Sequence, residues 1–226
     1  MSKSAASGSR IDDGGDGSAD GSRDRRANKA PGEAEADLKA MSDEDLLELI
    51  RTSREDAFQV LVERHIDRGY AVAYRILQNG SDAEDVVQDA FLKVWTRREV
   101  WENGRAKFST WLFRVVSNRC IDLLRKPRTE TVAELPELVD SSSNQSRDLE
   151  RREAGELLER AMMELPDQQR VALVFSYNEN MSNGEIAEIM ETTVSAVESL
   201  LKRGRQKLKQ LLRRQRADIL TAFTNS

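Results

Sequence analysis

The stretch that decides the fold of this chain is residues 181–216, MSNGEIAEIMETTVSAVESLLKRGRQKLKQLLRRQR. Ser182 and Glu185 form a capping box ahead of an apolar run that begins at Ile186, and this pattern predicts the start of a short helix. Residues 191–193 interrupt the pattern, and the spacing of apolar residues after them predicts a long amphipathic helix. Two helices joined by so short a turn indicate a helix-turn-helix.

The second of these helices has two different faces. Its expected buried stripe consists of Val194, Val197, Leu201, Gly204, Leu208 and Leu211. The opposite face is polar, with residues three and four apart: Ser195, Glu198, Ser199, Lys202 and Arg203. From 202 to 216 there are eight basic residues and no acid. We expect the polar face to read bases, whereas Arg205 and the later basic residues contact mainly phosphate groups.

Composition restricts the remaining functions. The net charge of the 226 residues is −5, so the basic run is local, whereas a protein that coats nucleic acid indiscriminately is usually basic overall. A single cysteine (Cys120) and a single histidine (His65) exclude an internal disulfide framework and a Cys/His zinc cluster, and no cofactor is expected. No apolar run approaches the roughly 20 residues of a membrane span, and the N-terminus lacks the apolar core of a signal peptide. We expect a cytoplasmic protein that does not insert into membranes.

Upstream of the helix-turn-helix, the pattern predicts an arm followed by a helical domain. Residues 1–39 contain little to bury and are expected to be disordered. Helices are expected from Ser42, from Arg54 to Leu77, and from Ser81 to Trp95. The last of these carries a polar face opposite its apolar stripe, made of Asp82, Asp85, Gln88, Asp89 and Lys93. On pattern alone, such a face is solvated more often than it binds a partner.

A further helix is predicted from Phe108 until Pro127 ends it. Its polar face carries Asn118, Arg119, Asp122, Arg125 and Lys126, which is compatible with contacts to single-stranded nucleic acid. Trp111 and Phe113 are expected in the core. The acidic, serine-rich residues 127–150 indicate a linker, and residues 151–220 a second helical domain before a short tail at 221–226. The expected fold is therefore all-α, with domains at 40–126 and 151–220 joined by a flexible linker.

Four blocks of the chain, in this order and spacing, resemble the sigma-70 family of bacterial transcription initiation factors, and most of all its compact extracytoplasmic-function (ECF) branch. The blocks are DAEDVVQDAFLKVW (82–95), FSTWLFRVVSNRCIDLLRK (108–126), LPDQQR (165–170) and MSNGEIAEIMETTVSAVESLLKRGRQKL (181–208). The resemblance covers about residues 40–220. It implies a sigma factor, not an enzyme, that binds core RNA polymerase and directs initiation at specific promoters, without a small-molecule substrate.

The resemblance also implies a role for each polar face. The acidic face at 82–93 would dock on the β′ clamp of the polymerase. In the family, the next helix recognises and melts the minus-ten promoter element and captures a flipped base, and Asn118 stands at the position of that pocket, with the other residues of its face beside it. Residues 151–216 would read the minus-thirty-five element and touch the β flap. A stress-response regulon, control by an anti-sigma protein and association with the nucleoid through polymerase would follow.

One residue departs from the family pattern. Glu198 lies on the base-reading face, where many relatives carry lysine or arginine. A glutamate cannot donate to guanine O6 or N7, but it can accept from cytosine N4 or hold a neighbouring arginine. The promoter sequence therefore cannot be transferred from a relative.

Two other classes of function remain open at this point. A stand-alone helix-turn-helix regulator would bind duplex DNA without polymerase, usually as a symmetric dimer, but it leaves residues 82–126 unexplained. An enzyme is the second alternative, because acids are plentiful. No phosphate-binding loop, metal cluster or catalytic triad accompanies those acids.

Overall fold

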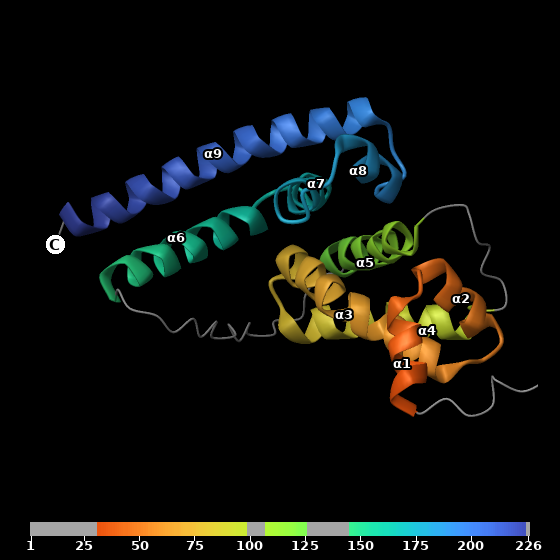
Figure 1. The fold of residues 1–226 in the computed structure, drawn as a ribbon. Helices are drawn as coiled ribbons and strands as arrows, with labels where there is room; N and C mark the ends of the chain where they lie inside the picture. Colours follow the sequence, from red (N-terminus) through yellow and green to blue (C-terminus); the bar gives the residue numbers. More distant parts are fainter. Residues whose placement is uncertain (1–30, 99–106, 126–144, 225–226) are drawn as a thin grey trace, which may run out of the picture.

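The computed structural model describes residues 31–98, 107–125 and 145–224. All the regular structure in these three ranges is helical, which confirms the predicted all-α class (Figure 1). The helices are α1 (Pro31–Ala40), α2 (Asp43–Arg51), α3 (Glu55–Leu77), α4 (Gly80–Thr96), α5 (Phe108–Arg125), α6 (Gln145–Met163), α7 (Asp167–Tyr177), α8 (Asn183–Ile189) and α9 (Val194–Thr224).

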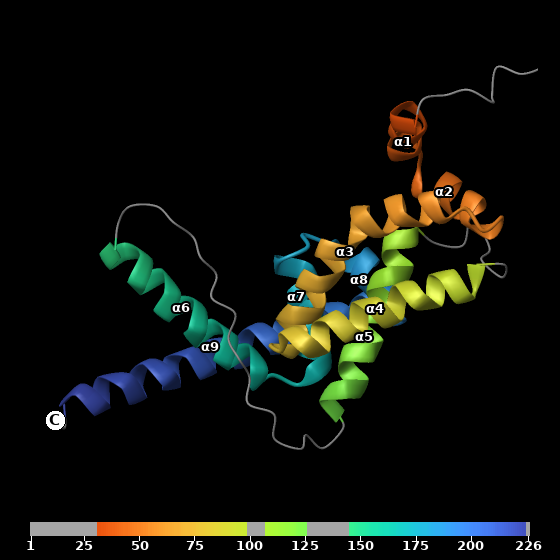
Figure 2. The ribbon, with the colours of Figure 1, turned by 90° about the horizontal axis from the view of Figure 1, so that it is seen from below.

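The first domain is a bundle built around α3. Helices α2, α4 and α5 all pack on α3, and α1 lies across one end of it (Figures 1 and 2). The turn into α4 differs in detail from the prediction, because the N-cap is Asn79, whose side chain accepts a hydrogen bond from the backbone N of Asp82 at 3.0 Å. Gln78 precedes it in the left-handed region, at φ 52°, which ends α3 and reverses the chain.

The second domain places the helix-turn-helix on a frame of two other helices. Helix α9 is a long rod; α6 lies beside its C-terminal half, and α7 and α8 lie beside its N-terminal half (Figure 1). Gly204 permits the close approach of α9 to α7, because a Cβ at this position would lie 3.0 Å from Cδ1 of Leu173. The recognition helix is therefore held by a frame within its own domain.

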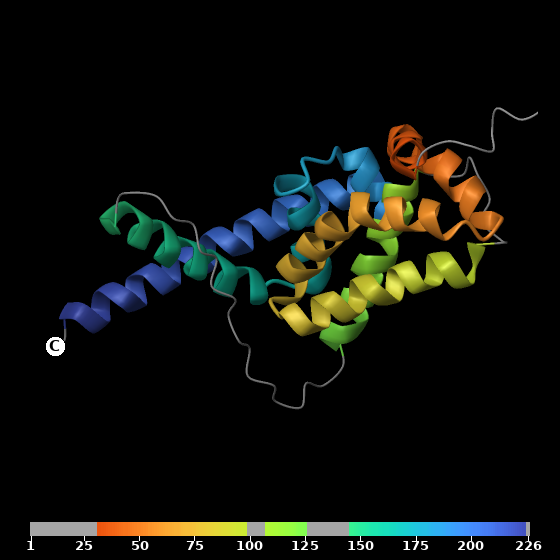
Figure 3. The same cartoon turned by 60° about the horizontal axis from the view of Figure 1, so that its bottom comes forward.

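The two domains share one continuous hydrophobic core. Helices α3 and α5 of the first domain contact α7 of the second, and α5 also contacts α8 (Figure 3). The rings of Phe113 in α5 and Phe175 in α7 are both fully buried, with centroids 5.8 Å apart. The prediction that Phe113 lies in the core is confirmed, whereas Trp111 is only half-buried.

Helices extend past three of the expected segment boundaries, and one expected core position is exposed. Helix α1 occupies the end of the predicted arm and buries Leu38, α6 begins at Gln145 within the predicted linker, and α9 continues to Thr224. Short or highly charged segments have a weak apolar period, so their helices depend on neighbours that the local pattern does not reveal. Val194 was expected in the buried stripe but is 46% exposed, because it stands at the first turn of α9, ahead of the part that packs on α7.

Candidate nucleic-acid interface

The helix-turn-helix consists of α8, a tight turn and α9. The predicted capping box is present: the Ser182 hydroxyl accepts from the backbone N of Glu185, and the Glu185 carboxylate accepts from the backbone N of Ser182. The backbone and side-chain hydrogen bonds from Ser182 lower the pKa of the Glu185 carboxyl. Glu191 forms the turn with φ 50°, and the Thr193 hydroxyl then accepts from the backbone N of Ala196. These local bonds orient α9 relative to α8.

The predicted base-reading face of α9 is open in the structure. All its members, and the predicted phosphate contact, are exposed: Ser195, Glu198, Ser199, Lys202, Arg203 and Arg205. The buried side of the same helix, at Val197 and Leu201, packs on its own domain. The helix therefore presents a continuous polar face, with a carboxylate between hydroxyls and cations.

The polar face of α5 lies on the first domain. Asn118, Asp122 and Arg125 are exposed, while Lys126 lies outside the described residues. Arg119 is half-buried, and its guanidinium is 3.5 Å from the carboxylate of Asp89 in α4. The face predicted to contact DNA and the face predicted to contact a protein thus meet at this ion pair.

The acidic face of α4 is accessible and contains a residue that the sequence interpretation missed. Of its predicted members, Asp85, Gln88 and Lys93 are exposed, whereas Asp82 and Asp89 are half-buried. Leu92 lies among them, one turn after Gln88 on the same side of the helix, and is 58% exposed. An apolar side chain off the buried stripe of an amphipathic helix was the signal in the sequence that could have identified it.

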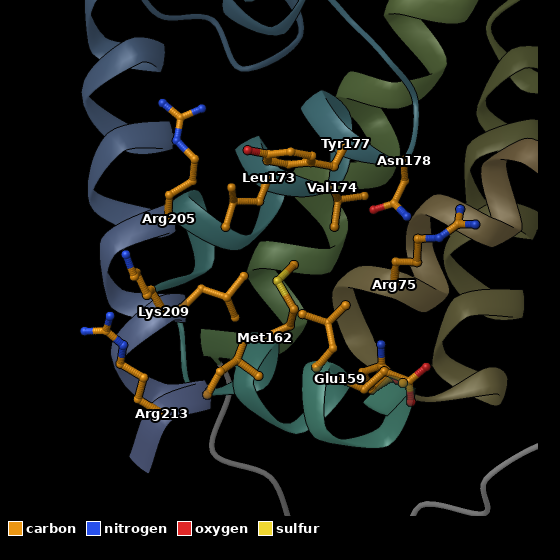
Figure 4. A pocket seen from close by; sticks show the side chains of 15 residues that line it. Arg75, Glu159, Met162, Leu173, Val174, Tyr177, Asn178, Arg205, Lys209 and Arg213 are labelled. Atoms are coloured by element: carbon orange, nitrogen blue, oxygen red, sulfur yellow. The ribbon is translucent and has the colours of Figure 1, made fainter. Parts of the chain in front are cut away.

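An apolar groove of about 690 Å³ lies between α6, α7 and the middle of α9 (Figure 4). Its floor includes Met162, Leu173 and Val174, and the exposed apolar side chains Leu158 and Tyr177 border it. Four cationic side chains, Arg75, Arg205, Lys209 and Arg213, also line it, together with the acidic Glu159. The end of α3 also contributes Arg75 and Gln78, so the lining runs from residue 75 to residue 213 and no local pattern predicted it.

The single histidine and the single cysteine are both buried within the first domain's helical bundle, residues 31–125. His65 is buried against Phe108, with ring centroids 5.0 Å apart, and its Nε2 is 2.7 Å from Oδ2 of Asp43. Cys120 is fully buried, and this burial raises the pKa of its thiol to about 12. Within the described ranges no group of three or more histidine, cysteine or acidic side chains could hold a metal ion, and no helix is long and apolar enough to cross a membrane.

Comparison with known proteins connects both domains to one family. Residues 61–130 match the model of sigma-70 region 2, and residues 155–208 match that of sigma-70 region 4. The chain is 30% identical to the ECF RNA polymerase sigma factor SigW of Bacillus subtilis over 73% of its own length and 93% of that protein. It is 29% identical to the ECF RNA polymerase sigma-E factor of Escherichia coli, over 77% and 98% of the two chains.

A solved structure agrees with the sequence matches. The structure of CnrH in complex with the cytosolic domain of CnrY is similar, with a TM-score of 0.56 and 28% identity over 75% of this chain and 96% of CnrH. The matched models cover both the bundle that carries α4 and α5 and the domain that carries the helix-turn-helix. The chain therefore belongs to the extracytoplasmic-function branch of the sigma-70 family of RNA polymerase sigma factors.

Proposed function

We propose that this chain binds core RNA polymerase and directs it to a specific set of promoters, with polymerase docking and minus-ten recognition on region two and minus-thirty-five recognition on region four. Region two here means α1–α5, and region four means α6–α9. The observation that carries the proposal is the presence of three accessible polar faces, on α4, α5 and α9, on a chain whose two halves both match sigma-70 regions.

In this proposal the recognition helix enters the major groove at the minus-thirty-five element. Ser195, Glu198 and Ser199 stand in the first turns of α9, where a recognition helix normally meets base edges. Lys202 and Arg203 extend the same face by one further turn. Arg205 and the later cations lie where the phosphate backbone would pass, and they position the helix without reading sequence.

The face of α5 is proposed to hold the opened minus-ten element. Flipping a base out of the stack costs a few kcal/mol of free energy. Stacking in the pocket, hydrogen bonds to the base edge and phosphate contacts must offset this cost. Asn118 offers both donors and an acceptor for a base edge, and Arg119 and Arg125 supply positive charge. Lys126 belongs to the same proposed set, although it lies outside the described residues.

The α4 face is proposed to bind the β′ clamp, with Leu92 as its apolar centre. Residues Asp85, Gln88, Asp89 and Lys93 would form the polar rim around this leucine, and Asp82 would extend it toward the start of the helix. An exposed apolar side chain within a charged surface has the composition of an interface hot spot surrounded by polar residues.

The apolar groove of region four is proposed as the contact for the β flap. Its apolar floor would receive the apolar side of a helix, and its basic rim favours an acidic border on that helix. Placement of a photo-crosslinker at Leu158, which borders the groove at 44% exposure, checks this assignment. Crosslinks to the β subunit are expected, and crosslinks only to other subunits would contradict it.

An anti-sigma partner is also proposed, together with a stress-response regulon and residence in the cytoplasm, on the nucleoid when polymerase is bound. The similar structure of CnrH was determined with the cytosolic domain of another protein, CnrY, bound to it. Co-purification from native cells in stressed and unstressed conditions should recover a partner besides polymerase. Recovery of polymerase alone in both conditions would contradict this part of the proposal.

Run-off transcription tests the main proposal. Purified core polymerase and a genomic promoter library are expected to give initiation at a defined set of sites only when this chain is added. Tight duplex binding by the chain alone, without stimulation of core polymerase, would instead favour the stand-alone regulator. The comparisons do not favour that alternative, because both halves of the chain match sigma-70 regions.

Substitution of Glu198 by alanine is expected to change base preference at one or two minus-thirty-five positions. Each lost base contact should alter discrimination by about 1–3 kcal/mol, and the measurement is selection from a randomised promoter pool with the holoenzyme. Lys207→Ala is the matched control, because a phosphate contact should weaken all sequences equally and reduce the salt slope by about 0.9. An unchanged preference for Glu198→Ala would exclude base reading by this residue.

A further inference from the structure

The apolar groove of region four carries an excess of positive charge. Its apolar lining is supplied by Leu158, Met162, Leu173, Val174, Leu208 and Leu212 (Figure 4). Four cationic side chains also line it against one acidic side chain, so positive charge prevails. The exposed Leu158 and Tyr177 leave apolar surface open to water at its border. A segment that combines apolar side chains with negative charge would therefore match this surface.

Three of the cations form a column on α9. Arg205, Lys209 and Arg213 follow one another at intervals of four residues, which is about 6 Å along a helix, and they lie on the same side of α9 (Figure 4). All three are exposed, whereas Glu159, the acid of the lining, belongs to α6. The complement of such a column is a segment with carboxylates at intervals of a few residues.

The chain itself contains a segment with this composition, residues 130–140 (ETVAELPELVD), here called the acidic segment. Its four carboxylates, at 130, 134, 137 and 140, are three or four residues apart, and no lysine or arginine occurs from 129 to 146. Between the acids lie Val132, Leu135, Leu138 and Val139. A spacer between two domains needs no such apolar side chains, because Gly, Ser, Pro or charged residues suffice. Residues 126–144 lie outside the described residues.

The covalent connection brings the acidic segment within reach of the groove. Leu138 is seven residues before Gln145, where α6 begins, and seven residues of extended chain span at most about 25 Å. Leu158 is thirteen residues after Gln145, which is about 20 Å along the helix. A chain that turns back along α6 can therefore place Leu138 beside Leu158. The short tether also gives an effective concentration on the order of 1 mM, so a weak contact suffices for occupancy.

We propose that the acidic segment occupies the groove in the free chain: Leu135 and Leu138 bury on the apolar lining, and the carboxylates face the cation column of α9. The occupant has the chemistry that is expected of the β flap, so the segment and the flap would compete for one surface. The occupancy depends on the groove and the acidic segment alone, whereas the competition rests on the proposed function. The linker thus has a role beyond joining the two domains.

Photo-crosslinking in the full-length chain tests the occupancy. Benzoylphenylalanine replaces Leu158 at the border of the groove, and the same group at exposed Gln206 of α9, which is not a lining residue, is the matched control. Residues 129–147 form one tryptic peptide, so mass spectrometry can identify a crosslink to it. At dilute protein concentration, the Leu158 probe should crosslink to this peptide several-fold more than the Gln206 probe does.

A charge exchange tests the pairing of the acidic segment with α9. Glu134→Lys/Glu137→Lys should reduce the crosslink from the Leu158 probe several-fold, because it brings two cations to the cation column. Adding Lys209→Glu/Arg213→Glu, at two exposed positions, should restore the crosslink. A failure to fold cannot produce such a restoration.

Binding of the acidic segment in trans measures how fully the groove is occupied. A fluorescein-labelled peptide of residues 129–147 is titrated with full-length chains, without polymerase. With an effective concentration on the order of 1 mM and an intrinsic Kd on the order of 0.1 mM, Leu135→Ser/Leu138→Ser should bind the peptide about tenfold more tightly than the parent, because its own segment no longer competes. Ser142→Ala/Ser143→Ala, on the same linker, should bind the peptide as the parent does.

The outcomes separate the occupancy from the proposed function. Equal crosslinking to residues 129–147 from both probes, or a crosslinked dimer in place of an internal crosslink, would overturn occupancy by the acidic segment. Equal peptide binding by the parent and by Leu135→Ser/Leu138→Ser would overturn it as well, and so would a charge exchange that restores nothing. With core polymerase added, the crosslinks of the Leu158 probe should shift from the acidic segment to the β subunit. An internal crosslink without any crosslink to β would support the occupancy and count against the flap contact.

Discussion

Substitution of Arg170 by methionine is expected to lower the free energy of unfolding by about 3–4 kcal/mol, because several buried carbonyl groups lose their donor together. Arg170 is only 3% exposed and donates to the backbone O of Met162, Met163 and Leu165 at 2.9, 2.6 and 3.1 Å. These carbonyls belong to the end of α6 and the turn after it, and the last carbonyls of a helix have no partner within the helix.

The same arginine connects the two regions. Its Nη1 donates to the backbone O of Ile76 in α3 at 2.9 Å, in a buried position. Methionine retains an unbranched apolar stem as far as the position of Nε, so the expected loss arises mainly from the hydrogen bonds, and the space that the guanidinium vacates adds to it. Arg170→Met should therefore destabilise the frame of the recognition helix and loosen its attachment to region two.

Urea unfolding of the full chain, followed by far-ultraviolet circular dichroism, measures this effect. Arg160→Met is the matched control, since Arg160 lies on α6 with an exposed ion pair to Glu156 at 3.9 Å. The control is expected to change the free energy of unfolding by less than about 0.5 kcal/mol. Equal transition midpoints for the two variants would refute the assigned role of Arg170.

Substitution of Leu92 by aspartate is expected to weaken binding of core polymerase by about 2 kcal/mol or more, which is roughly a thirtyfold increase in Kd. The side chain is 58% exposed in the free chain, so the folded bundle should tolerate the change. In the proposed complex, the introduced carboxylate would be desolvated at the centre of the α4 face without a partner. Affinity is measured by competition with the parent chain for labelled core polymerase.

The control for Leu92 is another partly exposed apolar residue of region two. Ile66 in α3 is 38% exposed and lies outside the α4 face, so Ile66→Asp introduces the same charge at a different place. It should leave polymerase affinity within about twofold, because surface substitutions outside an interface usually change little. Loss of affinity in both variants would indicate a general effect of charge or folding, and the assignment of Leu92 would then be wrong.

The fold class and the exposed faces were predictable because both depend on local periodicity. The period of 3.6 residues identified α3, α4, α5, α8 and α9, and the capping box at Ser182 located the start of α8 correctly. The exposed positions of Glu198 on α9 and Asn118 on α5 agree with the polar faces that their spacing indicated. Their roles in DNA recognition remain predictions.

The differences from the predictions arose where tertiary contacts decide whether a side chain is buried. Leu38 is buried in α1 although its segment is short and charged, and Val194 is exposed although it continues an apolar stripe. Periodicity specifies which side of a helix is apolar, but not how far along the helix a neighbour extends. Leu92 is a single apolar residue on the polar side of α4. The periodicity that defines the buried stripe does not identify such a residue.

The sequence by itself determined the family, the order of most of the helices and the polar faces of α4, α5 and α9, since these properties follow from short-range spacing and motifs. Only the tertiary structure decided that regions two and four pack together, that α6, α7 and α9 enclose an apolar groove, and that Arg114 and Arg170 serve residues of the other region. The physical reason is that such contacts join positions far apart in the chain. An arginine has the same local pattern whether its guanidinium meets water, a phosphate group or the end of a distant helix.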